Sequence, residues 1–147
     1  MLRSFKEYLE VGIVRKRSLN INRAENLIKN SKGRKDLLDR VLLKVEIKES
    51  DANYIIEQVY DILIELIRAK LFLDGFEASG NNAHEAEVSY LKELNFLDEE
   101  ISLMNELRTF RNGVKYYGKQ YTLEQSELSI KFLNSILPKL KKILKLT

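Results

Sequence analysis

Hydrophobic residues recur along most of this chain at spacings of three and four positions, which is typical of amphipathic helices. No run shows sustained alternation of polar and apolar positions, glycine is sparse, and the single proline stands at position 138. We therefore expect an all-α protein: an up-and-down bundle of five to six helices that forms one helical domain over residues 1–147.

The apolar pattern divides into successive helical segments. We expect helices over 4–14, 22–47, 52–73, 84–94, about 98–117 and 123–146. The third segment carries the broadest apolar stripe, so it is expected to lie at the centre of the bundle.

Capping residues locate the ends of two of these helices. Ser50 or Asp51 would cap the third helix, and Asn95 or Asp98 would begin the fifth. Gly118 is expected to end the fifth helix, because glycine adopts the left-handed conformation found just past helix C-termini.

Three further positions shape the second and the last helix. Thr122 followed by Gln125 is a capping box that begins the last helix. Gly33 weakens the middle of the second helix and leaves open whether it divides in two. Pro138 either kinks the last helix or makes its basic tail a separate turn.

Composition excludes several classes of function. Hydrophobic residues make up 44% and charged residues 32% of the chain, so neither disorder nor a membrane span is expected. The N-terminus has no long apolar run, and charges interrupt the most apolar segment, 54–73, so no signal peptide and no membrane partner are expected. Cysteine is absent, which excludes disulfides and thiolate sites and fits a cytoplasmic location. With His84 as the only histidine, no metal and no cofactor are expected.

The most distinctive stretch is 108–119, RTFRNGVKYYGK, which carries four cations and no acid within a net charge of +3. At about 100° per residue, Arg108, Arg111 and Lys115 fall within roughly 60° of one another on a helical wheel. Such a basic helix edge suits a phosphate or another anion. A solvated helix flank without function would show the same charges.

Neighbouring residues favour the functional interpretation. Tyr116 and Tyr117 could stack on bases while Lys119 and the other cations hold phosphates, although tyrosines at helical spacing could equally be core residues. Asn112 and Gly113 both cost helix propensity, which is unexpected inside an exposed helix.

His84 is the only side chain that ordinarily titrates near neutral pH. No serine or cysteine nucleophile pattern surrounds it, so we interpret it as structural or solvent-facing rather than as a general base. The segment 136–146 is a basic amphipathic helix, and we expect its apolar face to pack inward rather than onto a membrane.

The run SYLKELNFLDEEISLMNELRTFRNGVKYYG resembles the second half of a HEPN domain, a helical module of prokaryotic toxin–antitoxin pairs and other RNA-targeting systems. The endings LIRAKLFLDGF and HEA, and the N-terminal EYLEVGIVRKR, are also similar, so the resemblance covers about residues 5–135. It implies a metal-independent ribonuclease in active members, with two motifs facing each other across a homodimer. It also implies a minimal nucleotidyltransferase as a partner protein.

The hallmark of that family is an arginine, a polar residue, three variable positions and a histidine. Arg111 and Asn112 match the first two positions, but Tyr116 stands at the histidine position, with Lys115 beside it. A tyrosine with its ordinary pKa of about 10 is about 3 units too basic to be an efficient general base near pH 7. The resemblance therefore implies that phosphate binding survives where cleavage is lost.

We expect a non-catalytic HEPN-like protein that binds RNA or a nucleotide. One alternative is a structural or interaction module that docks an acidic partner. A second alternative is a weak metal-independent ribonuclease in which Tyr116 or Lys115 replaces the histidine. The residues expected to contact phosphate or RNA are Arg108, Arg111, Asn112, Lys115, Tyr116, Tyr117 and Lys119.

Overall fold

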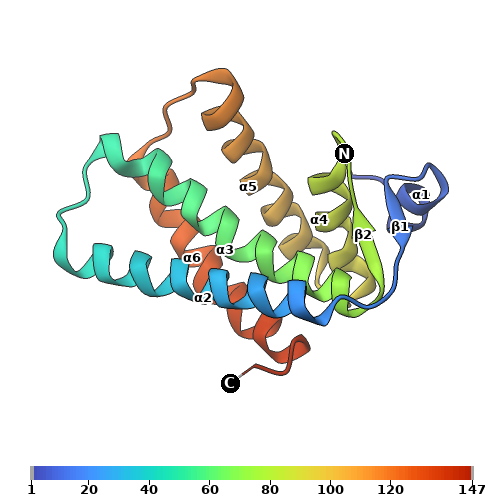
Figure 1. The fold of residues 1–147 in the computed structure, drawn as a ribbon. Coiled ribbons are helices and arrows are strands. Elements are labelled where there is room, and N and C mark those ends of the chain that lie inside the picture. The colour runs from blue at the N-terminus through green and yellow to red at the C-terminus, as the bar shows by residue number, and fades with distance from the viewer. Residues whose placement is uncertain (1, 147) are drawn as a thin grey trace.

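Helices dominate the computed structural model, which describes residues 2–146. In chain order the elements are α1 (Phe5–Glu10), β1 (Val14–Lys16), α2 (Ile21–Lys44), the 3₁₀ turn η1 (Glu49–Asp51), α3 (Ala52–Leu73), β2 (Phe76–Ala78), α4 (Ala83–Glu93), α5 (Asp98–Tyr117) and α6 (Leu123–Ile143) (Figure 1). This arrangement confirms the predicted all-α bundle.

Helix α3 lies at the centre, as its broad apolar stripe predicted. It runs antiparallel to α2 and also packs against α4, α5 and α6 (Figure 1). Its side chains are buried on several sides at once, among them those of Ile56, Val59, Ile62, Leu63 and Ile67. Close packing on several sides holds the backbone of α3 in place and so fixes where its polar residues stand.

The N-terminal region differs from the prediction. The first helix was expected to reach residue 14, but it ends at Glu10, and Gly12 reverses the chain at a φ of +80°. Strand β1 then pairs antiparallel with β2, with Val14 opposite Ala78. The helical prediction for this segment is wrong because strands of three residues are too short to show a period of two.

Most other boundaries fall close to their predicted positions. Helix α2 runs through Gly33 without a break, and α6 runs through Pro138 to Ile143. The capping box is confirmed, because Thr122 Oγ1 accepts from the Gln125 amide at 3.2 Å and Gln125 Oε1 accepts from the Thr122 amide at 2.8 Å.

Helix α5 begins at Asp98, the second of its two predicted starts, and it ends at Gly118, whose φ is +61°. The Glu100 carboxylate accepts a hydrogen bond of 2.9 Å from the Leu97 amide and so caps the first turn. Specific residues therefore cap both ends of α5, and these caps set the limits of the helix that carries the basic edge.

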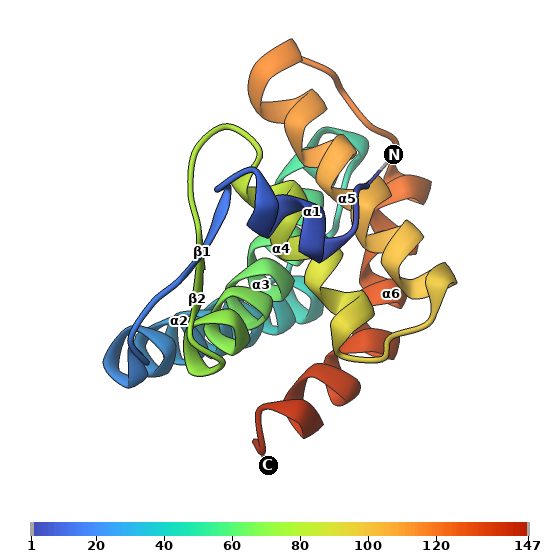
Figure 2. The same cartoon turned by 90° about the vertical axis from the view of Figure 1, so that its right-hand side faces the viewer.

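Helix α4 also packs against α3, and α1 packs against α4 (Figure 2).

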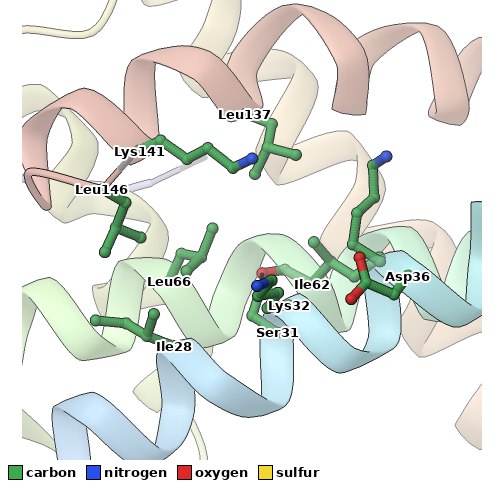
Figure 3. A pocket seen from close by; sticks show the side chains of 10 residues that line it. Ile28, Ser31, Lys32, Asp36, Ile62, Leu66, Leu137, Lys141 and Leu146 are labelled. Atoms are coloured by element: carbon green, nitrogen blue, oxygen red, sulfur yellow. Dashed lines mark hydrogen bonds between the residues drawn. The ribbon is translucent and has the colours of Figure 1, made fainter.

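In α6 the side chains of Ile136, Leu137 and Leu140 are buried, so the apolar face of the C-terminal segment packs inward as predicted. A cavity remains where α2, α3 and α6 meet (Figure 3). Within residues 2–146, no helix has the length and apolar character required to cross a bilayer.

Candidate functional site

The two arginines of the predicted basic edge turn toward the other helices rather than outward. The Arg108 side chain is only 15% exposed; its Nε donates to Asn105 Oδ1 at 3.0 Å, and its Nη2 lies 3.6 Å from Glu85 Oε1 on α4. The guanidinium carbon of Arg111 lies 5.6 Å from the centre of the Tyr60 ring on α3, a cation–π distance. Helix α5 therefore directs both arginines at α3 and α4.

The remaining predicted contact residues form the outer part of the edge. Lys115 and Lys119 are exposed and Asn112 is partly buried. Tyr116 and Tyr117 are 64% and 74% exposed, so neither is a core residue. Both aromatic rings are accessible to a ligand from solvent.

Gly113 has a packing role instead of a functional one. A Cβ at this position would collide with the hydroxyl of Tyr121, which lies over the helix backbone here. The Tyr121 ring packs in turn against Phe110, with ring centres 4.8 Å apart. Packing therefore explains the glycine, and it no longer supports a ligand site as it did from the sequence alone.

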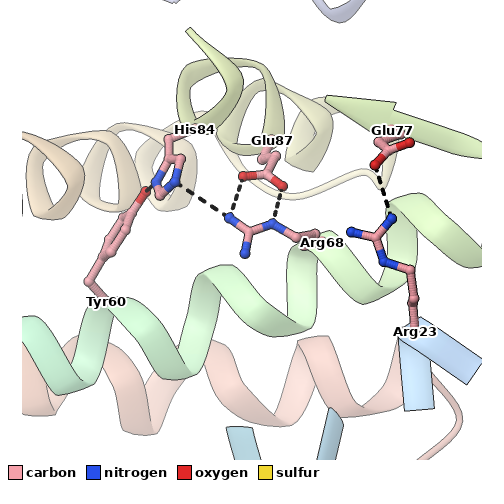
Figure 4. Close-up of polar contacts among 6 residues, drawn as sticks. All are labelled: Arg23, Tyr60, Arg68, Glu77, His84 and Glu87. Carbon is pink, nitrogen blue, oxygen red and sulfur yellow. Dashed lines mark hydrogen bonds and ion pairs between the residues drawn. The ribbon is translucent and has the colours of Figure 1, made fainter. Parts of the chain in front are cut away.

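A histidine that the sequence did not connect with this edge lies close to it. His84 stands in the first turn of α4, and its Nδ1 is 2.8 Å from the Tyr60 hydroxyl (Figure 4). Its Nε2 is 3.5 Å from Arg68 Nη2. Because a guanidinium can only donate, this contact assigns Nε2 as the acceptor and Nδ1–H as the donor to the Tyr60 oxygen.

Arg68 is itself held by a buried carboxylate. Its Nε and Nη2 donate to the two Glu87 oxygens at 2.5 and 2.9 Å (Figure 4). Burial raises the pKa of Glu87, and the bonds from Arg68 oppose that rise. The pKa of Arg68 is raised despite burial, because Glu87 favours the charged guanidinium. A paired arrangement of this kind fixes the guanidinium that faces His84.

The electrostatic field at His84 is strongly positive. Burial, followed by the charges of Arg68, Arg111, Arg108 and Lys115 in that order, lowers the pKa of His84 to about 4. The imidazole is therefore neutral near pH 7. These four residues are called the cation cluster below.

Sequence reasoning found three members of the cation cluster and missed the rest of the site. Tyr60, Arg68 and Glu87 were not identified, and His84 was interpreted as structural or solvent-facing. One signal was present, because Arg68 is one of the five charged residues that interrupt the apolar pattern of this helix. That charge was used only to exclude a membrane span.

No protein-family model matches this chain, and no curated protein or solved structure shows significant similarity to it. The site is therefore interpreted from its own chemistry. No group of three or more histidine and carboxylate side chains is placed to hold a metal ion within residues 2–146. The cation cluster instead offers several N–H donors and positive charge, which suit an oxyanion.

Proposed function

We propose that this protein is a HEPN-like helical protein that binds RNA or a nucleotide through the cation cluster. The observation that carries the proposal is the convergence of three cations of α5 and Arg68 of α3 on one neutral imidazole. Cations concentrated in this way repel one another, and a bound phosphate would relieve that repulsion.

The acids near the cluster leave part of its charge unbalanced. Glu87 pairs with Arg68, and Glu85 lies 3.6 Å from Arg108. Arg111 and Lys115 form no salt bridge with any acid in the described part of the chain. These two side chains are therefore the expected primary phosphate contacts, with Arg108 and Asn112 beside them.

The exposed end of α5 suits a ligand that extends beyond one phosphate. Tyr116 and Tyr117 present accessible rings on which bases could stack, and Lys119 adds a further positive charge. Stacking combined with phosphate contacts is how many proteins bind single-stranded nucleic acid.

A gel-shift experiment with Arg111→Ala tests the proposal. Labelled tRNA and a messenger-like transcript are mixed without metal with the parent protein, with Arg111→Ala, and with Arg40→Ala. Arg40 is an exposed arginine on α2, so its variant is a matched control for lost charge. We expect the shift to weaken about tenfold or more in Arg111→Ala and to persist in Arg40→Ala. Equal binding by all three proteins would contradict the proposal.

A metal-independent ribonuclease is the second candidate, and the position of His84 favours it. A neutral imidazole beside guanidinium groups could move a proton while the arginines stabilise charge on phosphorus. The pKa of about 4 makes the free imidazole a weak base, so binding without cleavage remains the leading proposal.

Denaturing gels of the same reactions separate the two candidates. RNA fragments that disappear in His84→Gln would establish cleavage through this histidine. Fragments that disappear only in the Lys115→Ala, Tyr116→Phe double variant would instead support the residues at the motif position. Intact RNA together with a native-gel shift supports binding alone.

The partner proposals rest on the HEPN resemblance. We expect a homodimer, detectable as twice the chain mass by size-exclusion chromatography with light scattering, and a nucleotidyltransferase as a partner protein. If neither a gel shift nor fragments appear while a protein partner co-purifies, the interaction-module alternative is supported.

A further inference from the structure

The cavity between α2, α3 and α6 has a volume of about 280 Å³ (Figure 3). No residue of the cation cluster lines it. Aliphatic side chains from three helices and the C-terminal turn make up half of the residues that line it. These are Ile28, Ile62, Leu66, Leu137 and Leu146. The surface is therefore suited to hydrocarbon rather than to a polar ligand.

The polar groups around this cavity are mostly ammonium groups. Lys32, Lys35 and Lys141 line it together with one acid, Asp36. Ser31 adds no free hydroxyl, because its Oγ donates to the Ile62 carbonyl at 2.7 Å. An incoming ligand therefore meets aliphatic carbon and a net positive charge.

In the described part of the chain, two of these three lysines are not paired with an acid, so their charges are available to a ligand. Lys35 Nζ lies 2.8 Å from Asp39, so that charge is already paired. Lys32 and Lys141 have no salt bridge with an acid among residues 2–146. Lys32 comes from α2 and Lys141 from α6, so the two ammonium groups reach the cavity from different helices (Figure 3).

We propose that this cavity binds a medium-chain fatty carboxylate, with its acyl chain against the aliphatic lining and its carboxylate between Lys32 and Lys141. The volume of about 280 Å³ lies just below the usual range for small-molecule pockets, which favours a short chain over a complete lipid. The charges favour an acid over an amine or a neutral alcohol of the same length. This site is independent of the RNA-binding proposal.

A chain-length series tests the apolar part of the proposal. Isothermal titration of the full chain with butanoate, hexanoate and octanoate should show affinity rising about fourfold for each added methylene until the cavity is filled. Octylammonium should bind at least tenfold more weakly than octanoate. Chemical-shift changes of the Ile28, Ile62 and Leu66 methyl groups locate the bound chain.

Charge variants of the lining test the head-group contact. Lys32→Gln and Lys141→Gln should each weaken octanoate binding about threefold to tenfold, and Asp36→Asn should strengthen it about twofold. Lys142→Gln is the matched control, because Lys142 is an exposed lysine next to Lys141 that does not line the cavity. Octanol binding should not change in any of these variants.

Three outcomes would overturn the proposal. The first is no saturable octanoate binding, and the second is octylammonium binding as tight as that of octanoate. The third is binding to vesicles of phosphatidylglycerol without binding of monomeric octanoate, which would assign the lysines to a membrane surface. Because all these variants lie outside the cation cluster, their gel shift with RNA should remain that of the parent protein whatever the titration shows.

Discussion

At the scale of single residues, the imidazole of His84 lies between the buried phenol of Tyr60 and the partly buried guanidinium of Arg68. Both belong to the central helix, where the core encloses Tyr60 and the ion pair with Glu87 holds Arg68 in place beside the ring. The fold therefore holds His84 in its neutral form. Because protonation of His84 is disfavoured only in the folded state, the free energy of unfolding should depend on pH.

We expect this histidine to destabilise the fold as the pH falls. Its pKa is about 4 in the folded protein and near 6.5 in the unfolded chain, so the unfolded chain binds more protons between these values. Acidification from pH 7 to pH 4 should therefore cost on the order of 2–3 kcal/mol through this residue. This loss is measured by comparing the free energies of unfolding of the parent protein and of His84→Gln in urea at each pH.

The slope with pH is the diagnostic quantity in that comparison. Loss of the Tyr60 hydrogen bond in His84→Gln changes stability by a similar amount at every pH, whereas the protonation effect acts only between about pH 4 and 7. If the two proteins lose stability in parallel over this range, protonation of His84 does not cause the loss of stability at low pH.

A bound anion should raise the pKa of His84. A phosphate in the cation cluster would offset the positive charges that, together with burial, hold the pKa near 4. Histidine ring NMR signals titrated with and without saturating RNA oligonucleotide should show a rise of about one unit or more. Arg111→Ala should also raise the pKa of the free protein, while Arg40→Ala should leave it unchanged.

At the scale of elements, sequence periodicity located the helices well. The predicted limits of α3, residues 52 and 73, agree with the structure because a broad apolar stripe follows directly after the capping position predicted at residues 50–51. Strands β1 and β2 were missed because their pairing depends on a neighbour some sixty residues away in the chain. Local patterns cannot carry that information.

Two helical glycines provide a matched test of packing against propensity. Gly33 in α2 faces open space, so Gly33→Ala should stabilise the protein by about 0.5–1 kcal/mol. Gly113 in α5 lies under the Tyr121 hydroxyl, so Gly113→Ala should destabilise it by about 1–2 kcal/mol, because Tyr121 must move off Phe110. Thermal unfolding of both variants gives the sign of each change in stability. Stabilisation in both variants would show that Tyr121 moves aside without an energetic cost.

At the scale of the whole molecule, the candidate site could be predicted only in part. Helical spacing placed Arg108, Arg111 and Lys115 on one edge, since these residues share a single helix. The contacts of that edge with Tyr60 and His84 arise from the packing of α3, α4 and α5. That packing is a tertiary feature, and no spacing along the sequence encodes it.

The cation cluster makes a quantitative prediction for binding by the intact protein. Each phosphate contact on a single strand contributes about −0.7 to the slope of log K against log salt concentration. If Arg108, Arg111 and Lys115 each neutralise one phosphate, the slope should be about −2, and Arg111→Ala should reduce its magnitude by about 0.7. Fluorescence anisotropy of a labelled single-stranded RNA between about 50 and 300 mM salt measures both slopes, with Arg40→Ala expected to retain the parent value. A slope near zero would mean that the aromatic rings at the end of α5, rather than its cations, carry the affinity, and the basic edge would then have to be assigned another role.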